Sequence, residues 1–196
     1  MIFYVELNMS KLNKTTDALI IVDVQNDFCP GGALAVPEGD KVVPVINDLI
    51  SKFDKVYTTQ DWHPANHMSF KEQGGLWPPH CVANTKGADF HPDLKARNAI
   101  HILKGTDKNK EAYSGFQGTD LADRLKKDGV KRIFVTGLAT DYCVKSTALD
   151  GLKKGFEVIV VSDVIKGVNI NPADSEKAIQ EMKSADIDII ESNEID

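Results

Sequence analysis

Short apolar runs rich in β-branched residues alternate with amphipathic segments along most of this chain, and this alternation limits the folds open to it. The run at 18–24, Ala-Leu-Ile-Ile-Val-Asp-Val, has the pattern of a strand covered on both faces. Similar patterns predict strands at 55–59, 99–103, 133–136, 157–161 and 187–190, and helices at 40–53, 121–127, 143–154 and 172–184. We therefore predict an α/β fold, a three-layer α/β/α sandwich around a mostly parallel, Rossmann-like sheet of about six strands.

Length, charge and cysteine content narrow the class of protein. The 196 residues contain no linker and no repeat, so we expect a single domain at 18–196 preceded by an N-terminal extension at 1–17. A net charge of -6 with scattered lysine and arginine argues against a nucleic-acid partner. No apolar run approaches the ~20 residues that span a membrane. Three cysteines without a CxxC pair predict no disulfide framework and favour a reducing, cytoplasmic setting.

Three of the predicted strands end in, or lead to, a reactive side chain. Asp23 lies near the end of the first strand, Lys104 closes the third, and Cys143 lies where the fourth strand leads into a helix. Ligands of open parallel sheets bind beyond the carboxyl ends of the strands, so these groups can meet there. A helix start lowers the pKa of a cysteine, and a carboxylate can act as its base. A buried Asp–Lys pair beside a structural cysteine is the alternative.

The segment at 60–98 has little periodicity, and a loop of this length in a compact domain is usually functional. It contains Asp61, His63, His67 and His80. The Asp-x-His spacing places a carboxylate and an imidazole on one side of an extended chain, and a third imidazole would complete an open site for zinc, iron or manganese. Cys81 is a less favoured ligand because His80 precedes it in a proline-fixed turn. Ordinary loop histidines are the alternative.

Five segments together resemble the nicotinamidase/pyrazinamidase branch of the isochorismatase-like cysteine hydrolases, over residues 18–190. The segments are Ile-Val-Asp-Val-Gln-Asn-Asp-Phe at 21–28, Asp-Trp-His-Pro-Ala-Asn-His at 61–67, Trp-Pro-Pro-His-Cys at 77–81, Ala-Tyr-Ser-Gly-Phe at 112–116 and Gly-Leu-Ala-Thr-Asp-Tyr-Cys-Val at 137–144. They follow one another in the order of that family. The metal signature within 61–80 favours this branch over the related isochorismatases, which lack it.

The resemblance implies roles for individual residues. The catalytic triad is Asp23, Lys104 and Cys143, and the metal ligands are Asp61, His63 and His80, with His67 as a fourth ligand or a residue behind them. The oxyanion hole consists of the Ala139 and Cys143 N–H groups, with a cis peptide between Leu138 and Ala139. The ring pocket is formed by Phe28, Trp77 and Tyr113. Each aromatic residue has core packing as its alternative role. The implied cofactor is one divalent metal ion, with zinc favoured and iron or manganese as alternatives.

The implied activity is hydrolysis of nicotinamide to nicotinate and ammonia through a thioester, as a step of NAD salvage, with pyrazinamide as a further substrate. The metal would bind the pyridine nitrogen and hold the amide carbon over Cys143. The alternatives are a hydrolase of another small amide or carbamoyl compound, an isochorismatase, and a non-catalytic metal-binding protein of the same fold. An uncovered sheet edge in a small acidic domain also suggests a homo-oligomer.

Overall fold

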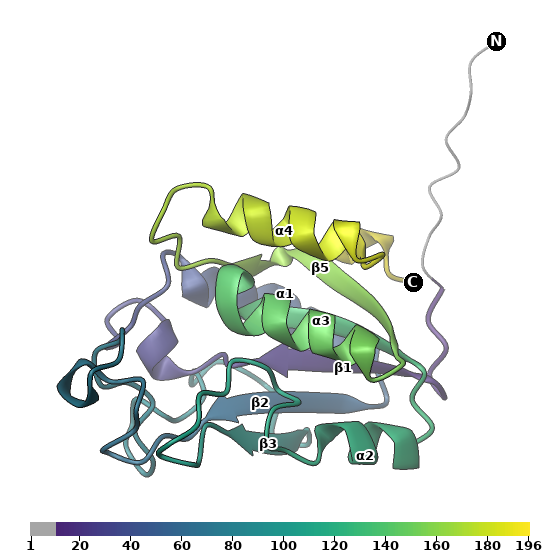
Figure 1. Ribbon diagram of the computed structural model, residues 1–196. Helices are drawn as coiled ribbons and strands as arrows, with labels where there is room; N and C mark the ends of the chain where they lie inside the picture. Colours follow the sequence, from purple (N-terminus) through teal and green to yellow (C-terminus); the bar gives the residue numbers. More distant parts are fainter. Residues whose placement is uncertain (1–10) are drawn as a thin grey trace.

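The computed structural model describes residues 11–196, which fold around a single six-stranded sheet (Figure 1). Every neighbouring pair of strands is parallel, and the strand order is β3-β2-β1-β4-β5-β6. The strands are β1 (Asp17–Val22), β2 (Val56–Asp61), β3 (Ile100–Lys104), β4 (Arg132–Leu138), β5 (Glu157–Lys166) and β6 (Asp188–Ile190). The predicted parallel α/β sheet is confirmed. Of the predicted N-terminal extension at 1–17, residues 1–10 lie outside the described residues.

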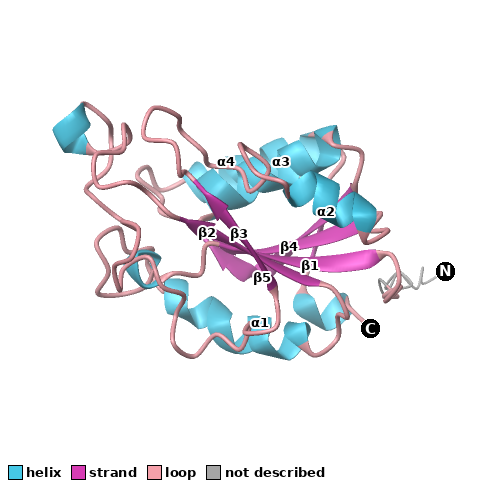
Figure 2. Cartoon of the chain, turned by 90° about the horizontal axis from the view of Figure 1, so that it is seen from below, coloured by secondary structure: helices cyan, strands magenta, loops and turns pink. Residues whose placement is uncertain are grey.

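Helices cover both faces of the sheet and complete three layers (Figure 2). Helix α1 (Val42–Ile50) lies on one face, and α2 (Leu121–Lys127), α3 (Lys145–Lys153) and α4 (Asp174–Ser184) lie on the other. Successive side chains of a strand point to opposite faces. Accordingly, Leu19 and Ile21 of β1 join the α1 core, whereas Ile20 packs with the α2–α4 side. Both faces of β1 are fully buried, which accounts for its unbroken apolar run.

Element ends differ from the sequence prediction where tertiary contacts extend or shorten them. Strand β5 runs to Lys166, past the predicted end at 161, because its last residues pair with Gly137 and Leu138 after a register shift in β4. The helix expected at 143–154 is a five-residue π-helical turn, Thr140–Val144, followed by α3. The first helix is shorter than predicted, because a single 3-10 turn occupies Gly39–Lys41.

The strand order creates a switch point between β1 and β4. The chain proceeds from β1 outward to β2 and β3, then returns to the other side of β1 with β4. The carboxyl ends of strands at such a point form a crevice for ligands. Between β2 and β3 the chain contains neither a strand nor an α-helix, and isolated bridges such as His63↔Val82 and Phe70↔Trp77 order it beside this crevice. In the described part of the chain, no helix is long and apolar enough to cross a membrane.

Candidate active site

The structure brings the three predicted strand-end groups together. Asp23 directly follows β1, Lys104 is the last residue of β3, and Cys143 lies in the π-helical turn after β4. The Lys104 ammonium is 3.0 Å from Asp23 Oδ2 and 3.6 Å from Cys143 Sγ. All three side chains are buried. A thiol, a carboxylate and an ammonium group therefore share one water-poor position at the switch point.

Burial shifts the pKa values of Cys143 and Asp23 in a way that the sequence did not predict. Burial raises the pKa of the Cys143 thiol well above its ordinary value, and the nearby Lys104 opposes this without reversing it. This direction is opposite to the one expected from a helix start, because loss of water outweighs the charge of Lys104. Burial also raises the pKa of Asp23. The resting site holds a thiol beside a carboxyl group that has become more basic.

Lys104 keeps its charge despite complete burial. Burial alone would lower its pKa, but Asp23 and Asp61 raise that pKa well above its usual value. Its ammonium group lies 2.5 Å from Asp61 Oδ1 and also donates to the Ala112 carbonyl at 3.0 Å. Burial acts to raise the pKa of Asp61, but Lys104 and His63 hold it below its usual range. Lys104 is therefore a fixed cation that balances two carboxylates.

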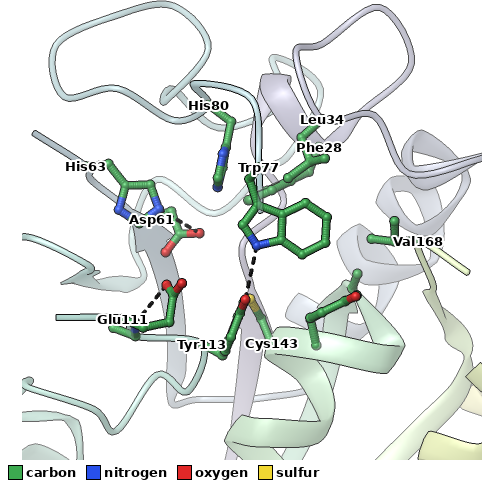
Figure 3. A pocket seen from close by; sticks show the side chains of 13 residues that line it. Phe28, Leu34, Asp61, His63, Trp77, His80, Glu111, Tyr113, Cys143 and Val168 are labelled. Atoms are coloured by element: carbon green, nitrogen blue, oxygen red, sulfur yellow. Dashed lines mark hydrogen bonds and ion pairs between the residues drawn. The ribbon is translucent and has the colours of Figure 1, made fainter. Parts of the chain in front are cut away.

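Asp61, His63 and His80 form a second cluster that adjoins the first. One donor atom from each lies within 4.8 Å of the other two, and Asp61 Oδ2 is 3.5 Å from His63 Nε2. His63 Nδ1 bonds to the Gly105 carbonyl at 3.0 Å, and His80 Nδ1 bonds to the Pro78 carbonyl at 2.8 Å. A carbonyl only accepts, so each Nδ1 carries a hydrogen, and in the neutral ring each Nε2 then has a lone pair for a metal ion. Figure 3 shows the two rings and the carboxylate turned toward one another.

This donor set fits a divalent metal ion. Two imidazole nitrogens and one carboxylate oxygen with an open side are a common zinc-binding set, and hydrogen bonds from the far ring nitrogens to carbonyls are the usual support for such ligands. The Gly105 carbonyl reaches His63 only because residue 105 lacks a side chain: a Cβ there would lie 2.4 Å from His63 Cε1. Gln25 supports the remaining ligand, since its amide bonds to both the N–H and the C=O of Asp61 at 2.8 Å.

His67 lies beside the cluster rather than in it. Its ring packs against the His63 ring at a tilt of 30°, with centroids 4.1 Å apart. Its Nε2 donates to the Lys110 carbonyl at 3.0 Å, and its Nδ1 lies 2.8 Å from Ser69 Oγ. Both ring nitrogens are thus engaged by the protein. Within residues 11–196, no close group of three donor side chains includes His67 or Cys81.

The two clusters open into one pocket. The pocket is narrow and partly open to solvent. The predicted ring-pocket residues Phe28, Trp77 and Tyr113 all line it, as does Cys143 (Figure 3). Ala139 lines it as well. Trp77 Nε1 donates to the Tyr113 hydroxyl at 3.0 Å. The peptide bond between Leu138 and Ala139 is cis, as the resemblance implied.

Sequence reasoning missed several residues of this site. Leu34, Glu111, Tyr142 and Val168 also line the pocket. Tyr142 precedes the cysteine and packs edge-on against Trp77, with ring centroids 5.0 Å apart, so its place in the motif was an available signal. Val168 belongs to the loop after β5, far along the chain from every motif, and only the folded structure brings it to the pocket.

Comparison with known proteins places this fold and site in one family. The isochorismatase domain model matches residues 17–194, which is nearly the whole of the described chain. The chain belongs to the isochorismatase family.

Individual relatives narrow the likeness to one branch of that family. The chain is 45% identical to the nicotinamidase of Escherichia coli (strain K12), over 86% of this chain and 91% of the relative. It is 55% identical to the pyrazinamidase of Pyrococcus horikoshii, solved in complex with zinc, with a TM-score of 0.85 over 89% of this chain and 98% of that chain. PnC1 from L. infantum, solved in complex with nicotinate, is 38% identical, with a TM-score of 0.91 over 95% and 98% of the two chains. The resemblance based on the five segments is confirmed.

Proposed function

We propose that this protein hydrolyses nicotinamide to nicotinate and ammonia through a thioester on Cys143. The observation that carries the proposal is a single pocket lined by the buried thiol of Cys143 and by the three metal donors. Beneath it, Lys104 pairs with both Asp23 and Asp61 and so links the two clusters. Aromatic side chains line the same pocket and suit a flat ring. The nicotinamidase and pyrazinamidase relatives support this substrate class.

The first half of the reaction is acyl transfer to sulfur. Asp23 takes the proton of Cys143, and Sγ attacks the amide carbon of the substrate. The backbone N–H groups of Ala139 and Cys143 hold the developing oxyanion, and loss of one such donor typically costs about 100- to 1,000-fold in rate. Asp23 returns the proton to the departing nitrogen, which leaves as ammonia. Lys104 stays protonated and offsets the negative charge as the proton moves.

The second half releases the acid. Asp23, again a carboxylate, takes a proton from a water molecule that attacks the thioester carbon. The same N–H donors hold the oxyanion, and the bond between carbon and sulfur breaks. Cys143 recovers its proton, and nicotinate leaves the pocket. Asp23 therefore acts as base and acid in alternation, a role that suits a carboxyl group whose pKa burial has raised.

Asp61, His63 and His80 would hold one divalent metal ion, with zinc favoured and iron or manganese as alternatives. When bound, the ion supplies a Lewis-acid contact for the ring nitrogen of the substrate. Pyrazinamide carries a nitrogen at the same ring position and is the expected second substrate. A cytoplasmic location, a place in NAD salvage and assembly as a homo-oligomer remain predictions that accompany this proposal.

The test is an assay of ammonia and nicotinate release from nicotinamide by the zinc-loaded protein, with and without a chelator. We expect turnover, its loss on chelation and its return when zinc is restored. Absence of nicotinamide turnover by the zinc-, iron- and manganese-loaded protein would overturn the proposed substrate. Turnover that survives complete metal removal would overturn the role given to Asp61, His63 and His80.

A further inference from the structure

The two carboxylate oxygens of Asp23 have different surroundings. Oδ1 accepts a hydrogen bond from Thr59 Oγ1 at 2.7 Å. Oδ2 lies 3.0 Å from the Lys104 ammonium, yet it is buried and receives no hydrogen bond of normal geometry. Because Oδ1 already has a partner, Oδ2 is the oxygen available to accept a proton from Cys143.

Thr59 holds Asp23 at two points. Besides the hydroxyl contact, the carbonyl of Thr59 accepts a hydrogen bond from the Asp23 N–H at 3.2 Å. Thr59 belongs to β2, where it pairs in register with Val22, the residue before Asp23. Both Thr59 and Asp23 have no exposed surface. A buried hydroxyl with a single charged acceptor is a well-determined hydrogen bond, because water does not compete for either group.

Gly115 determines which way the Thr59 side chain points. A Cβ at Gly115 would lie 2.6 Å from Thr59 Cγ2, so the methyl group of Thr59 occupies the space that the missing side chain leaves. The Gly115 N–H donates to Thr147 Oγ1 of α3 at 2.9 Å, which holds this backbone in place. In threonine the methyl and the hydroxyl share one χ1 angle, so fixing the methyl fixes the hydroxyl. The segment at 112–116 thereby acts on Asp23 as well as lining the pocket.

We propose that Thr59 is a positioning residue for the general base, and that Gly115 sets its rotamer. The Thr59 hydroxyl occupies Asp23 Oδ1 and thereby presents Oδ2 to the thiol of Cys143. The inference deepens the proposed function and rests on Asp23 acting as the base. The competing explanation is a buried threonine that only fills space between β2 and the 112–116 segment.

Three substitutions separate these explanations. Thr59→Val keeps the shape and removes the hydroxyl, whereas Thr59→Ser keeps the hydroxyl and removes the methyl. Thr136→Val is the matched control, because Thr136 is equally buried in β4 and its hydroxyl donates to the Ile20 carbonyl, away from Asp23. Each variant is loaded with zinc, and its metal content and thermal stability are measured beside kcat and KM for nicotinamide.

We expect Thr59→Val to lower kcat by about 10- to 100-fold, because a general base contributes ~100-fold or more and small misplacements forfeit much of it. KM and zinc content should stay close to those of the wild type. Thr59→Ser should recover most of kcat, and Thr136→Val should leave it unchanged. The inference is overturned if Thr59→Val retains the wild-type kcat, or if Thr59→Ser is impaired as much as Thr59→Val.

A second measurement keeps the inference testable without the proposed substrate. Iodoacetamide alkylates the thiolate of Cys143, and mass spectrometry identifies the labelled residue. We expect slower labelling of Cys143 in Thr59→Val than in the wild type, and restored labelling in Thr59→Ser. If the wild type does not hydrolyse nicotinamide, the substrate proposal fails while this readout still decides the role of Thr59. Equal labelling rates in all the variants would refute the positioning role.

Discussion

Replacement of Lys104 by methionine tests whether one buried cation stabilises the two carboxylates of the active site. The side chain of Lys104 has no exposed surface, and its ammonium lies 3.0 Å from Asp23 and 2.5 Å from Asp61. Methionine has a similar length, so the substitution removes the charge with little change in volume. It leaves the buried carboxylate of Asp23 without a counter-ion and that of Asp61 with His63 beside it.

The expected loss of stability follows from this arrangement. Removing one partner of a buried ion pair typically costs about 3–5 kcal/mol, because the remaining charge is left uncompensated. For a domain of this size each kcal/mol shifts Tm by about 2–4 °C, so Tm of the metal-free variant should fall by roughly 6–20 °C. The fall should be smaller with zinc bound, since the ion offsets the charge of Asp61. Amide hydrolysis should be lost in both forms.

The same variant should also show a characteristic pH dependence. Lys104 lowers the pKa of both Asp23 and Asp61, so its removal raises both values in the folded protein, and that of Asp23 already lies above its ordinary value. A group whose pKa is raised by folding contributes stability at low pH that is lost as pH rises. The difference in Tm between the wild type and Lys104→Met should therefore be largest near neutral pH and shrink as falling pH protonates the carboxylates of the variant.

Thermal unfolding followed by circular dichroism, with and without zinc, measures both effects. Lys145→Met is the control, because the 2.9 Å ion pair between Lys145 and Glu181 is partly exposed, and such pairs contribute about 1 kcal/mol or less. A metal-free Lys104→Met protein with the Tm of the wild type at neutral pH would refute the electrostatic argument. So would a loss of Tm that is the same at every pH.

Three other substitutions give further tests of the site. Cys143→Ala should reduce nicotinamide hydrolysis by about 10⁴-fold or more while zinc content and Tm stay near wild type, and substantial residual turnover would exclude the thioester. His63→Ala should lose zinc on dialysis, measured by elemental analysis, whereas His91→Ala, outside the cluster, should retain it. Equal zinc contents in these two variants would remove His63 from the ligand set. Lys104→Arg should also be inactive in the hydrolysis assay, because a planar guanidinium does not fit between two carboxylates and a thiol placed around a compact ammonium group.

The strands of the sheet were predictable because a strand that is buried on both faces has a continuous apolar sequence. The β1 run is apolar throughout because helices cover both of its sides. The end of strand β5 could not be predicted in this way. Ser162 and Asp163 signal a strand end by composition, yet the strand continues to Lys166 because the register of β4 shifts between Val135 and Gly137. Register depends on a partner strand, which local composition does not describe.

The reactive residues were predictable for a different reason. Each of Asp23, Lys104 and Cys143 stands at the end of a recognisable strand, and parallel strands bring their ends to one edge. Asp61 and His63 were found by their spacing. The supporting residues were not found: the Thr59 hydroxyl bonds to Asp23 and the Gln25 side chain bonds to Asp61, each from another strand or loop.

Strand pattern and residue type are local properties of the chain, so the fold class and the chemical groups of the site could be predicted from the sequence. How those groups behave depends on the folded structure. It engages both nitrogens of His67, links Asp61 to Lys104 as well as to His63, and keeps Cys143 as a thiol. These outcomes depend on burial and on partners distant in sequence. Local composition describes neither, so the protonation of the site and the hydrogen bonds that support it are defined only in the folded protein.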